Sequence, residues 1–205
     1  MMIRLVGSRG ARGVDLARRQ VTFSRRPLRR QGADLKPVGE VVSERVWRAM
    51  IDSSALLSKL GVGHALVGGL AVGAHGWPRA TKDVDFLVDD SAWQKTDGGL
   101  VVMRSGLPVQ AHGVAVDTLS IRDDESHLQA AIDAAERTEG VPVAPVEAVV
   151  YMKLASPRSR DRQDVIELVR AGLDVSSVRH YLDRHAPHLR GRFDEAVQTA
   201  ESEDE

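Results

Sequence analysis

Asp83 and Asp85, which flank Val84, are the side chains in this sequence best suited to metal chemistry. Residues 84–88 read as a β-strand, and side chains two residues apart on a strand point to the same face. Neighbouring carboxylates repel each other unless a cation lies between them, and oxygen ligands suit Mg²⁺ or Mn²⁺. We therefore predict that Asp83 and Asp85 bind Mg²⁺ (or Mn²⁺). The alternative is that Asp83 caps a turn and Asp85 is solvated.

Asp117 is the lone charged residue in a second strand-like run, residues 114–121, with the sequence VAVDTLSI. Its neighbours on the same face of the strand are Ala115 and Leu119. An aspartate buried in an apolar strand is costly unless its carboxylate has a partner or a metal ion. The alternative is an edge-strand aspartate that faces water.

A glycine pair, Gly68-Gly69, separates a short buried strand (residues 64–68) from a helix expected over residues 70–75. Two glycines at this position let the backbone approach a ligand closely, and a helix N-terminus favours anions. We predict that Gly68 and Gly69 bind phosphate through backbone N–H groups. A Gly-Gly pair alone is also compatible with an ordinary tight turn.

Three basic side chains are candidates for phosphate contacts. Lys153 is the single basic residue of a helix expected over residues 146–155 that is apolar nearly all round. A lysine on such a stripe either extends to the rim or reaches into a cleft, where it would neutralise a triphosphate. Arg79 and Lys82 lie in the loop before the Asp83 strand, where a cation would bind phosphate or pair with Asp83.

The next helix, expected over residues 159–172, adds Arg160 and Asp164. In one interpretation Arg160 or Arg158 contacts phosphates and Asp164 positions Lys153 or a base. In the other, these residues form ordinary charge pairs along a helix surface, because Arg158, Arg160 and Arg162 are all near Asp161 and Asp164, with Arg158 three residues from Asp161 and Arg160 four from Asp164.

The elements that must position these residues alternate between strands and helices, which predicts an α+β fold with a small mixed β-sheet and flanking helices. Helical periodicity covers residues 43–60, with Ser43 as the N-cap, and residues 126–138. We expect residues 91–99 to form a short helical or turn segment and residues 100–104 and 107–111 to form strands. Two further amphipathic helices, residues 175–185 and 189–200, make a C-terminal helical annex.

The charge distribution separates a basic arm from an acidic body. Residues 1–36 contain ten Lys or Arg and two Asp, a net charge of +8, whereas the other 169 residues contain 18 basic and 27 acidic side chains, a net charge of −9. The arm is interpreted as an RNA-binding segment, as a disordered leader, or as the result of a start assigned upstream of a true start near Val41 or Met50. The absence of cysteine excludes disulfides and thiol catalysis and fits a cytoplasmic protein, and no apolar run is long enough to span a bilayer.

The string VGGLAVGAHGWPRATKDVDFLV, within residues 66–89, resembles the signature of the nucleotidyltransferase superfamily, which has a polymerase-beta-like fold. More narrowly, it is similar to the branch near the AbiEii-type toxin nucleotidyltransferases, with GG-x-A-V-x-x-H-G-x-P-R-x-T-x-D-h-D, where h is apolar. The resemblance implies a sheet of the nucleotidyltransferase type. It also implies that Asp117 is the third metal carboxylate and accepts the proton of the attacking hydroxyl. One departure is Leu70, which stands where many members have Ser or Thr.

The resemblance implies a metal-dependent nucleotidyltransferase that moves a nucleoside monophosphate from an NTP to a hydroxyl acceptor. The acceptor is left open between a tRNA 3′ end, a protein and a small molecule, and the AbiEii likeness favours tRNA and a toxin with an antitoxin partner. The alternatives are a degenerate module that binds or regulates without catalysis and a nucleic-acid binder that uses only its arm. We divide the chain into a disordered basic arm (1–40), a nucleotidyltransferase core (41–144), a C-terminal helical part (145–200) and an acidic tail (201–205).

Overall fold

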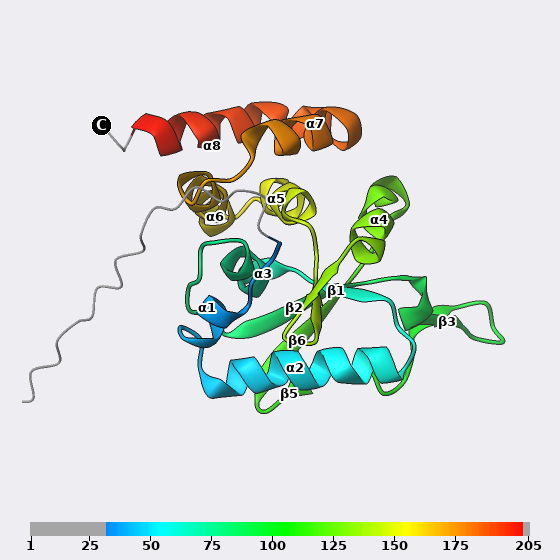
Figure 1. The fold of residues 1–205 in the computed structure, drawn as a ribbon. Helices are drawn as coiled ribbons and strands as arrows, with labels where there is room; N and C mark the ends of the chain where they lie inside the picture. Colours follow the sequence, from blue (N-terminus) through cyan, green and yellow to red (C-terminus); the bar gives the residue numbers. More distant parts are fainter. Residues whose placement is uncertain (1–31, 203–205) are drawn as a thin grey trace, which may run out of the picture.

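A six-stranded mixed β-sheet organises the protein in a computed structural model that describes residues 32–202 (Figure 1). The strand order is β5-β6-β2-β1-β8-β7. Strand β2 pairs parallel with β6 and antiparallel with β1, and β1 pairs parallel with β8. The strands are β1 (His64–Leu66), β2 (Asp83–Val88), β5 (Gln110–Ala111), β6 (Val114–Ser120), β7 (Glu136–Thr138) and β8 (Val141–Val143).

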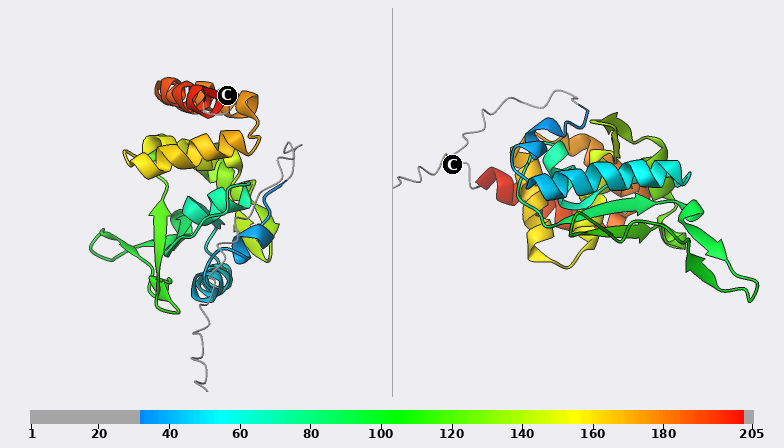
Figure 2. Two further views of the ribbon diagram at one scale, coloured as in Figure 1. Left: turned by 90° about the vertical axis from the view of Figure 1, so that its left-hand side faces the viewer. Right: turned by 90° about the horizontal axis from the view of Figure 1, so that it is seen from below.

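Helices cover both faces of this sheet. They are α1 (Lys36–Gly39), α2 (Glu44–Lys59), α3 (Gly68–Ala74), α4 (His127–Asp133), α5 (Val146–Ala155), α6 (Ser159–Arg170), α7 (Val175–His185) and α8 (Arg190–Ser202), with 3₁₀ turns at Asp90–Ala92, Asp123–Glu125 and Pro187–Leu189. Helix α2 lies across one face, and α3 and α5 lie on the other (Figures 1 and 2). The expected α+β fold with a small mixed sheet and flanking helices is confirmed.

The alternation of β2 explains which side chains face which layer. His64 on β1 hydrogen-bonds Ser54 on α2 at 2.9 Å, and its ring contacts Phe86 edge-on. Val84 and Phe86, both fully buried, therefore face α2. Because neighbouring strand residues point to opposite faces, Asp83 and Asp85 point toward α3 and α5.

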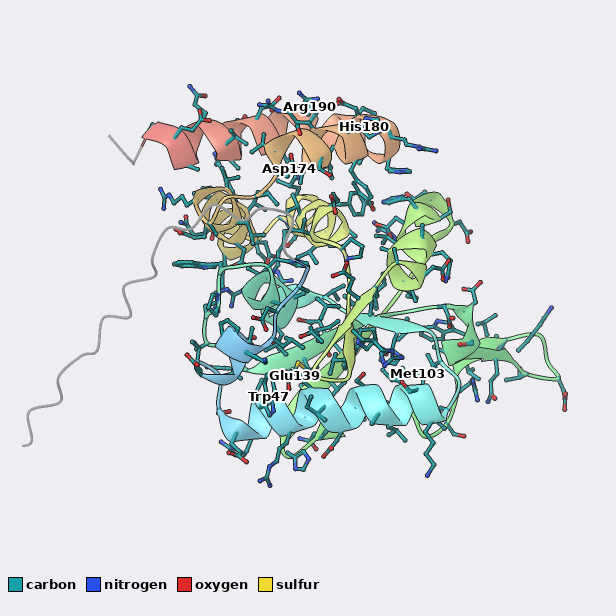
Figure 3. The ribbon with its side chains drawn as sticks, viewed as in Figure 1. Trp47, Met103, Glu139, Asp174, His180 and Arg190 are labelled. Carbon is teal, nitrogen blue, oxygen red and sulfur yellow. The ribbon has the colours of Figure 1, made fainter. Side chains whose placement is uncertain are left out.

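The two predicted C-terminal helices are present as α7 and α8, and they form a further layer over α5 and α6. Helices α7 and α8 lie side by side on the side of α5 and α6 that is remote from the sheet, and His180 and Arg190 lie in this outermost layer (Figures 2 and 3). Phe193 and Leu168, both nearly inaccessible to solvent, join this layer to the rest of the core.

Several predicted boundaries are confirmed and others are wrong. Ser43 caps α2 by accepting from the Val46 N–H at 3.4 Å. The helix predicted over residues 126–138 ends at Asp133, because β7 pairs with β8 as a hairpin instead. The segment predicted as helix or turn at residues 91–99 contains β3 (Trp93–Lys95), which pairs with β4 (Val101–Met103) in a separate hairpin.

The described structure also extends upstream of the boundary placed at residue 40. Leu35 and Val38 are fully buried, and α1 packs beside α3. The rest of the basic arm and the end of the acidic tail lie outside the described residues. No helix within residues 32–202 combines the length and apolarity that a membrane span requires.

Candidate active site

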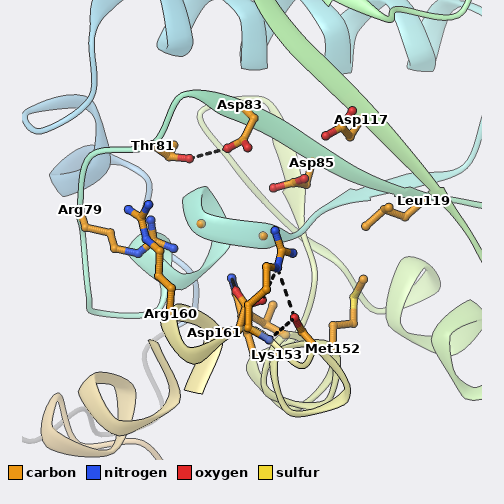
Figure 4. Close-up of a pocket in the computed structure, with 15 residues that line it drawn as sticks. Arg79, Thr81, Asp83, Asp85, Asp117, Leu119, Met152, Lys153, Arg160 and Asp161 are labelled. Atoms are coloured by element: carbon orange, nitrogen blue, oxygen red, sulfur yellow. Dashed lines mark hydrogen bonds and ion pairs between the residues drawn. The ribbon is translucent and has the colours of Figure 1, made fainter. Parts of the chain in front are cut away.

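Strands β2 and β6 bring the three predicted carboxylates together. Asp85 and Asp117 stand directly opposite each other in the parallel pair of strands. Asp83 lies two residues before Asp85, on the same face of β2. All three line a pocket of about 280 Å³ that lies between the sheet and the helices α3, α5 and α6 (Figure 4). Asp83 and Asp117 are exposed, whereas Asp85 is half-buried.

The environment of Asp85 raises the pKa of its carboxyl well above the ordinary value. Burial, followed by the charges of Asp83 and Asp117, raises its pKa to about 6, and the charges of Lys153 and Arg158 oppose this increase only in part. Ionised Asp85 is therefore held at an energetic cost in the protein as it stands. A cation bound between these carboxylates would remove that cost.

Position 68 requires a glycine, because a larger side chain there would overlap the carboxylate of Asp85. Its φ is +65°, and a Cβ added there would lie 1.9 Å from Asp85 Oδ2. We predicted that the glycine backbone approaches a ligand closely. In the structure, the group that Gly68 approaches is the side chain of Asp85. The structure places both glycines in the first turn of α3 instead of in a turn before the helix, and both line the pocket.

Gly68→Ala is expected to destabilise the fold by about 2–4 kcal/mol and to displace the Asp85 carboxylate, because it combines positive-φ strain with an atomic overlap. Urea denaturation measures the loss. Gly61→Ala is the matched control, since Gly61 has a φ of +69° with no atom within 4 Å of its added Cβ. It should cost only about 1 kcal/mol. Equal losses in the two variants would show that the Asp85 contact has no influence.

The three carboxylates do not converge on one point. Asp83 Oδ1 accepts a hydrogen bond from the Thr81 hydroxyl at 2.7 Å, which turns this carboxylate toward the loop (Figure 4). Across residues 32–202, no three His, Cys, Asp or Glu side chains are arranged as a ready metal site. The donor set nevertheless fits Mg²⁺ or Mn²⁺, because these ions prefer carboxylate oxygens and the three carboxylates lie on one face of the sheet.

A buried ion-pair network forms the wall opposite the carboxylates. Lys153 Nζ lies 2.6 Å from Asp161 Oδ1 and 2.8 Å from Asp164 Oδ2. Arg79 binds both oxygens of Asp164, at 2.6 and 2.7 Å. Asp164 is 2% exposed and Lys153 is 8% exposed, so these are not surface pairs.

The network changes what each predicted residue can do. The hydrogen bonds to Asp164 raise the pKa of Arg79, whose guanidinium ties the loop before β2 to α6. Arg160 reinforces this tie by donating to the Ala80 carbonyl at 3.2 Å. Arg79, Lys153 and Arg160 all line the pocket, whereas Lys82 is exposed and is not among the lining residues. The prediction that Lys82 contacts phosphate is therefore not supported by its position.

Two residues that line the pocket, Asp161 and Thr81, have no role assigned to them from the sequence. Asp161 pairs with Lys153 and also with Arg158, whose Nε lies 2.9 Å from its carboxylate. Burial is the largest single influence on the Asp161 carboxyl and acts to raise its pKa. The hydrogen bonds from Lys153 and Ser156 and the nearby cations together outweigh burial, so the pKa of Asp161 lies below its ordinary value. Thr81 was detectable because it lies two residues before Asp83, on the same side of an extended chain.

No protein-family model matches this chain, and no curated protein matches it. Among solved structures, an antigenic nucleotidyltransferase-like protein from Paracoccidioides brasiliensis is similar, with 18% sequence identity and a TM-score of 0.41. The match covers 75% of this chain and 94% of that one. The chemistry that the site can perform is therefore inferred from its own side chains.

Proposed function

We propose that this protein is a metal-dependent nucleotidyltransferase that transfers a nucleoside monophosphate from an NTP to a hydroxyl group and releases pyrophosphate. The observation that carries the proposal is the register of β2 and β6, which sets Asp85 directly beside Asp117 with Asp83 on the same face. Three carboxylates at the mouth of a pocket whose opposite wall is cationic suit a substrate that carries phosphates and arrives with Mg²⁺.

In this proposal Asp83, Asp85 and Asp117 would hold Mg²⁺ or Mn²⁺, which supplies charge stabilisation at the reacting phosphate when bound. Asp117, exposed at the pocket rim, accepts the proton of the acceptor hydroxyl. The wall that faces the phosphates has a net positive charge. It contains four cations, from Arg79, Lys153, Arg158 and Arg160, and two carboxylates, from Asp161 and Asp164. The catalytic contribution of these groups is positioning and electrostatic stabilisation.

Leu70 provides no hydroxyl for a phosphate, so backbone N–H groups would have to hold it, and this departure favours the non-catalytic alternative. Its side chain is 1% exposed and belongs to the core, so it does not face the pocket. The backbone of Gly68 and Gly69 and the hydroxyl groups of Thr81 and Ser156 line the pocket in its place. The alternative is a module that binds nucleotides without transfer, and it is favoured by the carboxylates that do not converge.

We further propose a tRNA 3′ end as the acceptor and an antitoxin as the partner, in the manner of AbiEii-type toxins. The motif in residues 66–89 and the net charge of +8 over residues 1–36 support this choice, because Lys and Arg bind phosphate backbones. A protein hydroxyl is the second acceptor to test.

The direct test incubates the protein with each α-labelled NTP, Mg²⁺ or Mn²⁺, and either bulk tRNA or no added acceptor. We expect metal-dependent label on tRNA, loss of label with a chelator, and loss in Asp117→Asn. Asp97→Asn is the matched control, because Asp97 is exposed in the β3–β4 turn and does not line the pocket. Binding of Mg²⁺ and NTP without transfer to tRNA or to the protein itself would support the non-catalytic alternative.

A further inference from the structure

The pocket changes character from one end to the other. Arg79 and Arg160 lie at one end, the carboxylates lie in the middle, and Leu119 and Met152 lie at the other end (Figure 4). A nucleoside triphosphate has the same order of charge, with phosphates at one end and an aromatic base at the other. The pocket therefore favours one orientation of a bound nucleoside triphosphate over the opposite one.

The strand and helix periodicities place the apolar end beside the carboxylates. Leu119 follows Asp117 by two residues, so both point to the same face of β6, and its partner across the ladder is the fully buried Leu87. Leu119 itself is 39% exposed, because β5 pairs with β6 only at Val114 and Ala115 and leaves this part of β6 uncovered on that side. Met152 precedes Lys153 on α5 and is half-buried, with Val149 one turn before it.

We infer that Leu119 and Met152 hold the nucleobase, so that the triphosphate extends past the carboxylates toward Arg160; this inference rests on the proposed function. An exposed leucine and a flexible methionine form an apolar surface on which a planar base can lie. The opposite orientation would place a polyanion against Leu119 and Met152 and a neutral base among cations, which is unfavourable for both groups.

The same surface predicts weak discrimination between bases. The side chains of Leu119, Met152 and Val149, which form this apolar end, carry no N–H or O–H group that could donate to a base edge. Strong discrimination between bases requires side chains that hydrogen-bond the base edge, whereas apolar contact alone distinguishes ligands by only about 10-fold to 200-fold. We therefore expect the dissociation constants of the four NTPs to agree within about tenfold.

The test measures binding by calorimetry, with Mg²⁺ present, for the four NTPs and for inorganic tripolyphosphate. Leu119→Ala and Met152→Ala should each weaken NTP binding about fivefold to tenfold, because each removes apolar area from the base contact. Neither variant should change tripolyphosphate binding. Leu100→Ala, which alters a leucine that is 70% exposed on the separate hairpin, should leave both affinities unchanged.

The outcomes separate this inference from the proposed function. NTP affinities within twofold of wild type in both variants would overturn the base assignment alone. Equal weakening of NTP and tripolyphosphate would also overturn it, because the variants would then have disturbed the phosphate end. A change in the KM for tRNA with an unchanged NTP affinity would assign the apolar end to the acceptor. A wild type that binds no NTP would overturn both proposals.

Discussion

Asp85→Asn is expected to abolish nucleotidyl transfer and, in the same variant, to increase thermal stability in the presence of a chelator. The loss of transfer should reach about a thousandfold, because the substitution removes the central carboxylate that would hold the metal ion at the reacting phosphate. The gain in stability should reach about 1–2 kcal/mol at pH 8, because Asn keeps the shape of the side chain but carries no charge. Transfer assays and thermal unfolding of the same preparations measure both effects.

The pH dependence of this gain follows from the raised pKa of Asp85. The folded-state pKa of about 6 lies above the ordinary value of 3.8, so ionisation costs stability as the pH rises between these values. The cost is fully present above about pH 6 and absent below about pH 4. The stability difference between Asp85→Asn and wild type should therefore shrink as the pH is lowered from 8 to 4. Full activity, or a loss of stability at pH 8, would contradict the assignment.

Asp164→Ala is expected to destabilise the fold by about 3–5 kcal/mol, the largest loss among the substitutions considered. Its carboxylate binds Arg79 at 2.6 and 2.7 Å and Lys153 at 2.8 Å, and it is 2% exposed. Removing it leaves two cations beside a single remaining carboxylate, Asp161. Urea denaturation at pH 7 measures the change in the free energy of unfolding.

Two comparisons distinguish this effect from a general sensitivity to charge removal. Glu44→Ala breaks the exposed pair between Glu44 and Arg48, with side chains 72% and 62% exposed, and should cost less than about 1 kcal/mol. Asp164→Asn, which keeps the volume of the side chain, is the milder variant if Asp164→Ala fails to fold. Transfer should fall with stability in Asp164→Asn, in contrast to Asp85→Asn, where the two move in opposite directions. A cost below about 1 kcal/mol for Asp164→Ala would contradict a structural role for the network.

The sequence was sufficient where the physics is local. The alternation of Asp83, Val84, Asp85 and Phe86 placed the two acids on one face and the two apolar residues in the core, because strand periodicity depends only on neighbouring residues. The same rule explains why Lys82 is not among the residues that line the pocket. Its side chain leaves the chain on the side opposite to Asp83, whereas Thr81 lies on the same side and hydrogen-bonds it.

Local propensity failed where pairing between distant segments decides the structure. Residues 134–138 follow a helical pattern, but Glu136–Thr138 pairs with β8 through a two-residue turn at Glu139 and Gly140. Both turn residues have positive φ, 49° and 80°, as a tight hairpin turn requires. Backbone pairing across this turn outweighs the helical preference.

The sequence by itself determined that Asp83 and Asp85 form a same-face pair beside a glycine pair, and that Lys153 interrupts an apolar helix. Only the tertiary structure decided that Asp117 stands opposite Asp85 and that Gly68 lies under the Asp85 carboxylate. It also decided that Asp164 binds both Lys153 and Arg79, which precedes Asp164 by 85 residues. The reason is that periodicity is set by adjacent residues, whereas strand register and the choice of ion-pair partner are set by how segments far apart in the sequence pack together.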